Sequence, residues 1–449
     1  MSTQAATGAD TPAEHSERYL WYVVALLAMA STISIIDRQI MNVMIGPIKR
    51  DLGGLSDLQV SLVIGLAFAF VYNIASFPAG RFADRANRRN IMAGGIVAWS
   101  VAGGFCGLAG TYWQLFLARM GVGIGEAALG PAANSTLADL FDKARLPIAI
   151  GIVSAAPFIG QGLAGMVGGP LIDYLEATPN MEVPVLGEIY SWQMVFLLLT
   201  PPGLIIAVML LFTREPKRKG RSREDLTAIP WSDVWKFVKG RRMFFFLVFT
   251  AYLCLSIQGW SLMIWIYEFF DRTHDWSRGR TGLIYGPIGM SVGIFASVYA
   301  GFRAGKMVAK GREDATLRLV FYGSIILIPS AVALTIVPSP WMAIALLIPV
   351  TFMMAMPPGL MMTTLQTIAP NELRGQMVAF YLIAVNFLSY TFAPSLPPLM
   401  DLLLFGEEST LGVSISVLAA FNYTVAAICL GLSLKYYRQA LDAAKAWAT

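Results

Sequence analysis

Twelve stretches of about 20 mostly apolar residues, separated by short polar segments, occupy most of this 449-residue chain. A helix of that length crosses the hydrocarbon core of a bilayer. Because backbone groups in lipid must be hydrogen-bonded internally, such stretches form helices rather than open sheets. The sequence therefore predicts an all-α integral membrane protein with twelve transmembrane helices, near residues 19–46, 57–80, 90–109, 112–138, 146–172, 191–213, 243–270, 279–302, 319–337, 341–368, 375–404 and 410–434.

The composition agrees with a membrane protein and excludes several other classes. Only 14% of the residues are charged, whereas about a quarter would be charged in a soluble protein. The polar residues 1–18 lack the basic and apolar regions of a signal peptide and predict a disordered cytosolic tail. Cys106, Cys254 and Cys429 stand alone in apolar stretches, so no disulfide framework, metal site or other cofactor is expected.

The distribution of Lys and Arg predicts the orientation in the membrane. If the N-terminus is cytosolic, the inner segments hold 26 of the 33 basic residues, and the outer loops hold only Lys49, Arg50, Arg272, Arg278 and Arg280. This asymmetry places both termini in the cytosol. It also accounts for the pI near 9 without a nucleic-acid partner.

A basic segment at 214–242 divides the chain into two halves of six spans, 19–213 and 243–437, followed by a cytosolic tail at 438–449. A weak repeat supports this division: GRFADRANRR at 80–89 corresponds to RAGKMVAKGR at 303–312, and Arg145 corresponds to Arg374. Two pseudo-symmetric six-helix bundles are typical of secondary transporters, whose site lies near the midplane between them.

The loop GRFADRANRR resembles the signature loop of the major facilitator superfamily, and it matches every constrained position of that pattern. Gly80 is suited to close helix contact, and Asp84 can face the positive N-terminus of a helix in the other half. The resemblance implies that Asp84, Arg85 and Arg89 take part in switching between inward-open and outward-open states. We assign Arg145 to the same gating group; the alternative is a simple positive-inside anchor.

Arg38 and Arg119 are the only basic residues that lie well inside the spans rather than at their ends, and Asp37 and Glu126 lie close to them in the sequence. A charged side chain at membrane depth costs roughly 2.5 to 3.5 kcal/mol, so such residues usually line a polar pathway. Arg119 and Glu126 are seven residues apart and share one helix face. The predicted depths pair Arg119 with Asp37, which leaves Glu126 to bind a proton or to meet Arg38.

The segments around these charges, ISIIDRQIMNVMI at 33–45 and LARMGVGIGEAALGPA at 117–132, resemble the Spinster family. Animal members of that family export sphingosine-1-phosphate and move lysophospholipids. The resemblance implies a bacterial-type homologue in the inner membrane that moves amphipathic anionic lipids by alternating access.

A mechanism follows from these four residues as a hypothesis. Arginine stays protonated, whereas a carboxylate in a cavity can take up a proton as its surroundings change. Protonation would release Arg119 or Arg38 to bind an anionic headgroup such as phosphate. The alternative is a static salt-bridged quartet that fixes helix register.

The C-terminal half offers an uncharged surface opposite these charges. Its seventh and tenth spans supply aromatic and methionine side chains, and we expect an apolar cavity wall from Tyr252, Trp260, Trp265, Met353, Met356 and Met361. Flexible thioethers adapt to irregular apolar tails. Ordinary packing between helices or against lipid is the alternative.

The sequence thus predicts a monomeric, proton-coupled or proton-gated secondary transporter of amphipathic anionic lipids, with export favoured. A carrier of the same fold for a small organic anion or sugar phosphate would use the same arginines. A transporter-like receptor that binds without translocating is a third possibility. An enzyme is not expected, because the sequence contains no phosphate-binding loop, metal cluster or nucleophile motif.

Overall fold

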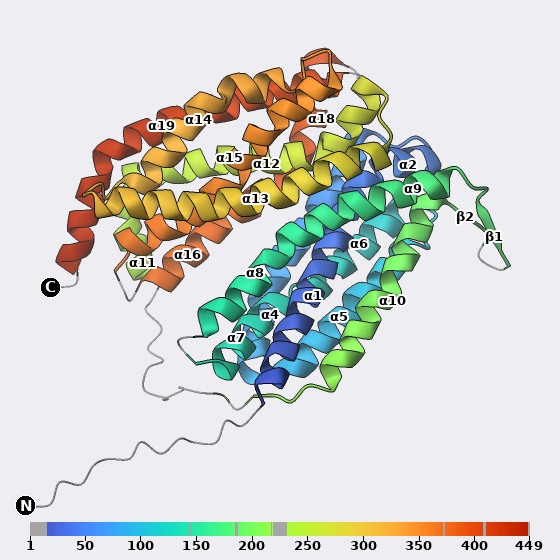
Figure 1. Cartoon of the computed structure of the whole chain (residues 1–449), viewed down its shortest axis with the longest axis horizontal. Helices are drawn as coiled ribbons and strands as arrows, with labels where there is room; N and C mark the ends of the chain where they lie inside the picture. Colours follow the sequence, from blue (N-terminus) through green and yellow to red (C-terminus); the bar gives the residue numbers. More distant parts are fainter. Residues whose placement is uncertain are drawn as a thin grey trace, which may run out of the picture.

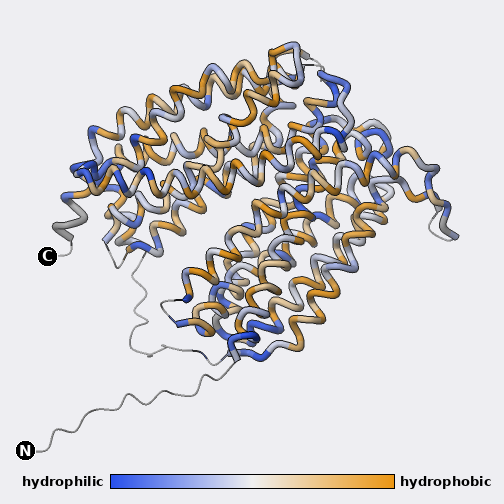
Figure 2. The backbone as a smooth tube through the Cα atoms, viewed as in Figure 1, coloured by the Kyte–Doolittle hydropathy of each residue, from blue (hydrophilic) through white to orange (hydrophobic). Residues whose placement is uncertain are grey.

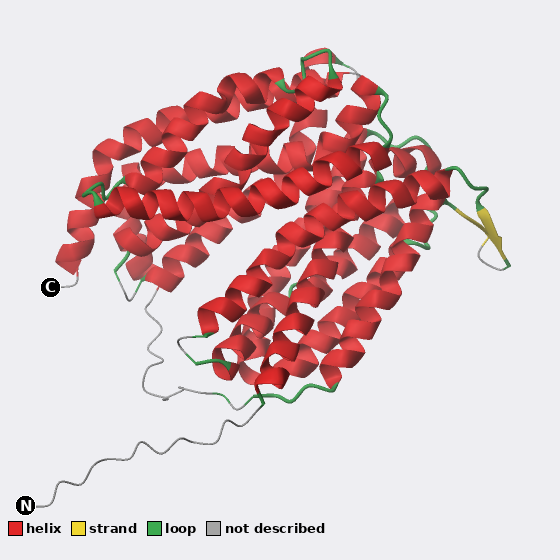
Figure 3. Cartoon of the chain, viewed as in Figure 1, coloured by secondary structure: helices red, strands yellow, loops and turns green. Residues whose placement is uncertain are grey.

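Each expected span corresponds to one helix or to a broken run of helices in the computed structural model (Figure 3). The structure describes residues 16–142, 145–184, 187–216, 218, 231–370, 373–406 and 410–447. Apart from one short hairpin, the regular structure of these residues is helical. The prediction of an all-α membrane protein is confirmed.

The N-terminal bundle contains the first six spans. It comprises α1 (Glu17–Val43), α2 (Ile45–Asp51), α3 (Asp57–Leu62), α4 (Val71–Arg85), α5 (Arg88–Cys106), α6 (Tyr112–Glu126), α7 (Leu129–Leu140), α8 (Leu146–Leu163), α9 (Gly169–Glu176) and α10 (Ser191–Leu211). The π-helical segments Val63–Phe70 and Ala164–Gly168 join α3 to α4 and α8 to α9. Strands β1 (Met181–Val183) and β2 (Gly187–Ile189) form an antiparallel hairpin, in which Met181 pairs with Ile189.

The C-terminal bundle follows a short amphipathic helix, α11 (Trp231–Lys239). It comprises α12 (Arg242–His274), α13 (Arg278–Ala309), α14 (Ala315–Ala333), α15 (Pro340–Ile368), α16 (Arg374–Tyr381), α17 (Leu388–Phe392), α18 (Leu396–Met400) and α19 (Leu411–Trp447). The eleventh span is a single broken run from α16 to Phe405, interrupted by π-helical turns and by a 3-10 turn at Ala393–Ser395.

Ten of the helical runs in the described residues are long and apolar enough to cross a membrane. The other two expected spans are α5, which begins with two arginines, and the α6–α7 pair, which contains Arg119 and Glu126. Helix α5 packs between α6 and α10 inside the N-terminal bundle. Hydrophilic residues gather at the ends of the bundles, as the tube in Figure 2 shows.

The two bundles meet at one end and separate toward the other (Figure 1). We call these the hairpin end, which carries β1 and β2, and the linker end, which carries Ser16, Arg214–Pro216 and α11. Glycines bring backbones together near the hairpin end. A Cβ atom on Gly282 of α13 would lie 2.0 Å from the carbonyl oxygen of Gly165, and one on Gly65 would lie 2.3 Å from that of Thr391. Small residues permit such close helix packing.

Helix α19 continues past residue 437 to Trp447, so the segment expected as a cytosolic tail begins as part of this helix. At the start of the basic linker, Tyr19 Oη accepts a hydrogen bond of 2.6 Å from the backbone N–H of Arg214. Residues 1–15 of the expected N-terminal tail lie outside the described part of the chain.

Candidate functional site

The four charged residues predicted from the sequence come together between α1 and α6. Asp37 and Arg38 lie in the second half of α1, and Arg119 and Glu126 lie two turns apart on α6. Arg119 and Glu126 are 1% and 2% exposed, and Asp37 is also buried. The cluster is therefore nearly sealed from solvent in this state.

Arg38 rather than Arg119 holds the ion pair. Its Nε atom donates to Oε2 of Glu126 at 2.5 Å, and the Ser34 hydroxyl donates to the same oxygen at 2.7 Å. Of the two roles expected for Glu126, contact with Arg38 is the one observed. Adjacent residues on a helix point about 100° apart, which explains why Asp37 faces a different neighbour.

Arg119 contacts Asp37 through the backbone and not through its carboxylate. A guanidinium N–H donates to the Asp37 carbonyl oxygen at 3.3 Å, while Nε of Arg119 has no hydrogen-bond partner. The Asp37 carboxylate makes no hydrogen bond or ion pair in the described structure. The expected Arg119–Asp37 ion pair is thus absent, and Arg119 forms no ion pair within the described residues.

Aromatic rings of the second span pack against the two arginines of the cluster. The guanidinium carbons of Arg38 and Arg119 lie 5.1 and 5.0 Å from the ring centre of Phe68, and that of Arg38 lies 4.5 Å from Tyr72. Such contacts stabilise desolvated cations without neutralising them. Phe68 belongs to the π-helical segment Val63–Phe70, and π-helical turns are frequent at functional sites.

A cavity of about 740 Å³ lies on the C-terminal side of the cluster. It is bounded by α8, α12, α13, α15 and α19, and none of its lining residues is charged. A second void, of only about 10 Å³, is lined by Arg38 and Arg119. Trp260 and Met263 line both this void and the larger cavity. The unpaired arginine and the uncharged cavity are therefore neighbours across these two side chains.

Three of the six residues predicted for the apolar wall line this cavity: Tyr252, Trp260 and Met353. The predictions for Trp265, Met356 and Met361 are wrong. Trp265 lies about 140° round α12 from Trp260, where its indole N–H donates to the Pro394 carbonyl at 2.8 Å. Met356 packs toward Gly323 of α14, and Met361 is fully buried in the core.

Two residues that line the cavity carry buried hydroxyl groups. The Tyr252 Oη and Thr351 Oγ1 atoms have no hydrogen-bond partner, and both residues line the cavity. A buried polar group without a partner costs about 1–3 kcal/mol. Tyr252 was expected at this wall, whereas no pattern in the sequence placed Thr351 beside it.

An ionic network that the sequence did not reveal closes the hairpin end. Asp57 of α3 accepts two hydrogen bonds from Arg272 of α12, at 2.6 and 2.7 Å, and a third from Lys49. Arg272 also bonds Glu268 at 2.8 Å. The Asp57–Arg272 pair joins the two bundles, and Asp57 is fully buried.

A second bridge lies beside it. Arg278 contacts Glu176 of the N-terminal bundle at 3.7 Å, and Asp173 accepts a hydrogen bond of 2.9 Å from the backbone N–H of Gly279. Which acids Arg272 and Arg278 meet depends on how the two bundles dock, and no spacing in the sequence encodes that.

At the linker end, the structure places the signature loop differently from expectation. Gly80 makes no close contact, because a Cβ atom there would meet nothing within 4 Å. The side chain of Asp84 lies outside the described residues, and Arg85 is exposed. Arg89 donates to the carbonyls of Leu211 and Thr213.

Two further basic residues form ion pairs at this end of the N-terminal bundle. Arg145 pairs with Glu17 at 2.7 Å on the surface. Arg88, which the sequence reasoning passed over, is fully buried and bonds Asp139, Glu215 and the Ser135 hydroxyl. It ties the loop to α7 and to the start of the linker.

The family model of the Major Facilitator Superfamily matches residues 27–394 of this chain, which is most of its length. The chain belongs to the major facilitator superfamily. An MFS-type efflux pump of Mycolicibacterium smegmatis is 27% identical over 332 residues, which cover 73% of this chain and 72% of that protein.

Two solved structures share the whole fold. Both are of a bacterial homologue of the human lysosomal transporter Spinster, in an inward-facing occupied and an inward-facing unoccupied conformation. The TM-score is 0.77 for each, with 25% and 24% identity; each comparison covers 95% of this chain and 97% or 98% of the other. The protein is thus a multi-pass membrane transporter of the major facilitator superfamily and not an enzyme, and its fold is similar to that of this Spinster homologue.

Proposed function

We propose that this transporter moves amphipathic anionic lipids of the lysophospholipid or sphingoid-phosphate class, coupled to protons and acting as a monomer. The observation that carries the proposal is Arg119, a buried guanidinium that forms no ion pair and whose Nε has no hydrogen-bond partner. A buried charge that is not directly paired is costly, and an anionic group of the cargo would offset that cost. The planar guanidinium fork suits phosphate.

The adjoining cavity supports an amphiphile over a small anion. Its 740 Å³ and its uncharged lining of aromatic, methionine and glycine residues suit an acyl chain or sphingoid tail. Tyr252 and Thr351 would hydrogen-bond the glycerol or hydroxyl groups between headgroup and tail. The headgroup would reach Arg119 by displacing Trp260 or Met263, which separate the two spaces.

Proton coupling is proposed through Glu126 and Asp37. The Glu126 carboxylate is held by Arg38 and Ser34, so its protonation would release Arg38 beside Arg119. Two arginines would then face the cargo headgroup. Asp37, which has no ion-pair partner, is the second proton acceptor in reach of this site.

The arrangement supports an inward-facing state. The positive-inside rule places the linker end in the cytosol, and the bundles are joined at the opposite end by Asp57–Arg272 and Glu176–Arg278. Alternating access would break these bridges and close the linker end, where Arg85 and Arg89 lie. Asp84 stays a proposed member of that closure.

The test is flux into proteoliposomes of a labelled lysophospholipid, a labelled sphingoid phosphate and a labelled hexose phosphate, with and without an imposed pH gradient. The proposal expects both amphiphiles to move, faster with the gradient. Movement of the hexose phosphate alone would assign the small-anion carrier. Binding of an amphiphile without movement of any of the three would assign a receptor.

A further inference from the structure

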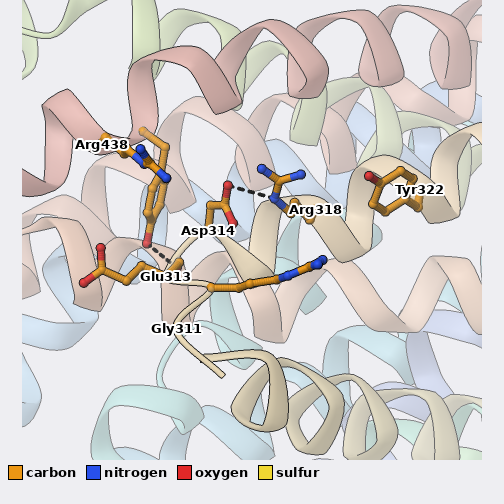
Figure 4. Close-up of a pocket in the computed structure, with 8 residues that line it drawn as sticks. Gly311, Glu313, Asp314, Arg318, Tyr322 and Arg438 are labelled. Carbon is orange, nitrogen blue, oxygen red and sulfur yellow. Dashed lines mark hydrogen bonds and ion pairs between the residues drawn. The ribbon is translucent and has the colours of Figure 1, made fainter. Parts of the chain in front are cut away.

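A further cavity, of about 420 Å³, lies at the linker end of the C-terminal bundle. None of its lining residues belongs to the charged cluster. It is formed by the turn between α13 and α14 and by the flank of α19 (Figure 4). Arginines dominate its lining: Arg312, Arg318 and Arg438 surround it, together with Asp314, Tyr322 and Tyr437. None of these residues lines the 740 Å³ cavity between the bundles, which we call the transport cavity.

The charges in this cavity are not balanced. Arg318 is paired with Asp314 at 2.8 Å, as the dashed line in Figure 4 shows. Neither the Arg312 nor the Arg438 side chain has a hydrogen bond or ion pair within the described residues. Glu313 also lines the space, but its side chain extends away from the Arg318–Asp314 pair. Two guanidinium groups are thus available to an anion.

The internal repeat explains why Arg312 is left without a partner. It ends the repeat RAGKMVAKGR and corresponds to Arg89 in GRFADRANRR. Arg89 donates to the carbonyls of Leu211 and Thr213, which are free because α10 ends there. In the C-terminal half, α19 continues past Tyr437 to Trp447, so its carbonyls are used within the helix.

The turn that carries Arg312 is held in place. The Tyr437 hydroxyl of α19 donates to the Glu313 carbonyl at 2.8 Å, and Arg312 N–H donates to the Met307 carbonyl at 3.1 Å. The backbone of this turn is thus held against α19, which keeps Arg312 and Arg438 beside one cavity. Both side chains are exposed and can turn toward an anion.

An apolar surface leads from this cavity along the membrane-facing side of α14. Arg318, Tyr322 and Ile326 are four residues apart and form one stripe. Tyr322 is 48% exposed and Ile326 is 70% exposed, so both face the lipid in a bilayer. A phosphate at the arginines with an acyl chain along this stripe is the geometry of a bound phospholipid.

We propose that this cavity binds the headgroup of an anionic phospholipid from the leaflet at the linker end. The site is separate from the transport site and does not depend on the proposed cargo. A free phosphate would use the arginines alone, whereas a phospholipid also uses Tyr322 and Ile326. The continuous apolar stripe is the reason to prefer the lipid.

The experiment measures lipid preference by native mass spectrometry and by thermal stability in detergent. Phosphatidylglycerol and phosphatidylcholine of equal chain length are added to the parent protein and to the double variant Arg312→Gln/Arg438→Gln. We expect the parent to prefer phosphatidylglycerol and the double variant to lose roughly tenfold or more of that preference, since two charge-assisted hydrogen bonds are removed. Lys310→Gln, a control at an exposed lysine outside the cavity, should behave as the parent.

Three further outcomes decide the proposal. Arg312→Lys/Arg438→Lys should keep most of the preference, which shows that charge and not folding is responsible. Unchanged preference in the Gln double variant would overturn the assignment. If inorganic phosphate stabilises the protein as much as phosphatidylglycerol does, the assignment of a lipid is wrong and the cavity binds a free anion.

Discussion

Replacing Asp57 with asparagine should shift the transporter out of the state described here. The Asp57 carboxylate is fully buried and accepts hydrogen bonds from Arg272 at 2.6 and 2.7 Å. Breaking a buried ion pair costs about 3–5 kcal/mol. Because the Arg272 side chain is 27% exposed, we take the lower end, about 3 kcal/mol, which corresponds to roughly a hundredfold change in equilibrium.

This free-energy cost applies only to the state in which the Asp57–Arg272 pair is formed. Opening the hairpin end separates α3 from α12, so the pair is already broken in the outward-facing state. The substitution therefore destabilises the inward-facing state relative to the outward-facing one. A similar cost in both states would leave the equilibrium unchanged.

Double electron–electron resonance between spin labels can measure the shift. Labels at Asn87→Cys and Lys239→Cys report the linker end, and labels at Thr178→Cys and Pro338→Cys report the hairpin end; all four positions are exposed. The three native cysteines are buried and can be replaced by alanine. In Asp57→Asn, the linker-end distance should shorten and the hairpin-end distance should lengthen.

Asp51→Asn is the matched control, because Asp51 pairs with Arg50 within the N-terminal bundle and Arg50 is 63% exposed. An exposed pair contributes less than about 1 kcal/mol, so its distance distributions should match the parent. If Asp57→Asn also matches the parent at both ends, the ion pair does not hold the bundles together and the reasoning fails.

The remaining predictions concern packing, stability and protons. Gly282→Ala should shift the same distances as Asp57→Asn, because its Cβ would meet the Gly165 backbone at 2.0 Å; Gly301→Ala on the same helix meets nothing and should have no effect. Arg88→Gln should lower the thermal midpoint measurably, since it removes the buried guanidinium that pairs with Asp139 and Glu215, at a cost of about 3–5 kcal/mol for a buried pair; the exposed Arg85→Gln is its control, and equal midpoints would contradict the role given to Arg88. Glu126→Gln should flatten the pH dependence of flux while binding persists, and a pH profile identical to the parent's would remove Glu126 from proton coupling.

The features that were predicted well from the sequence are those that depend on a single helix. Span positions follow from runs of apolar residues, and the burial of Arg119 and the partial burial of Arg38 follow from their place inside such runs. The shared face of Arg119 and Glu126 follows from helical periodicity. These features need no knowledge of how the helices dock.

The parts that sequence missed depend on rotation and contact between helices. Arg119 was paired with the Asp37 carboxylate, yet it donates only to the Asp37 backbone carbonyl. Trp260 and Trp265 were assigned to one wall, yet the rotation of α12 directs only Trp260 into the cavity. The motif drew attention to Arg89, while the buried ion pairs belong to its neighbour Arg88.

The same limit applies at the hairpin end. Asp57 and Arg272 are 215 residues apart in the chain, and neither stands in a motif. Their pairing requires the two bundles to be placed against each other. A single sequence contains no periodic signal for that placement.

Binding of an anionic lysolipid to Arg119 is the claim on which the account rests. Isothermal titration of detergent-solubilised protein with lysophosphatidylglycerol and with lysophosphatidylcholine, in the parent and in Arg119→Gln, tests it most directly. The account predicts that the parent prefers the anionic lysolipid and that Arg119→Gln binds it at least about tenfold more weakly, the loss expected for a charge-assisted hydrogen bond. Equal affinity of the parent and Arg119→Gln for lysophosphatidylglycerol would contradict it.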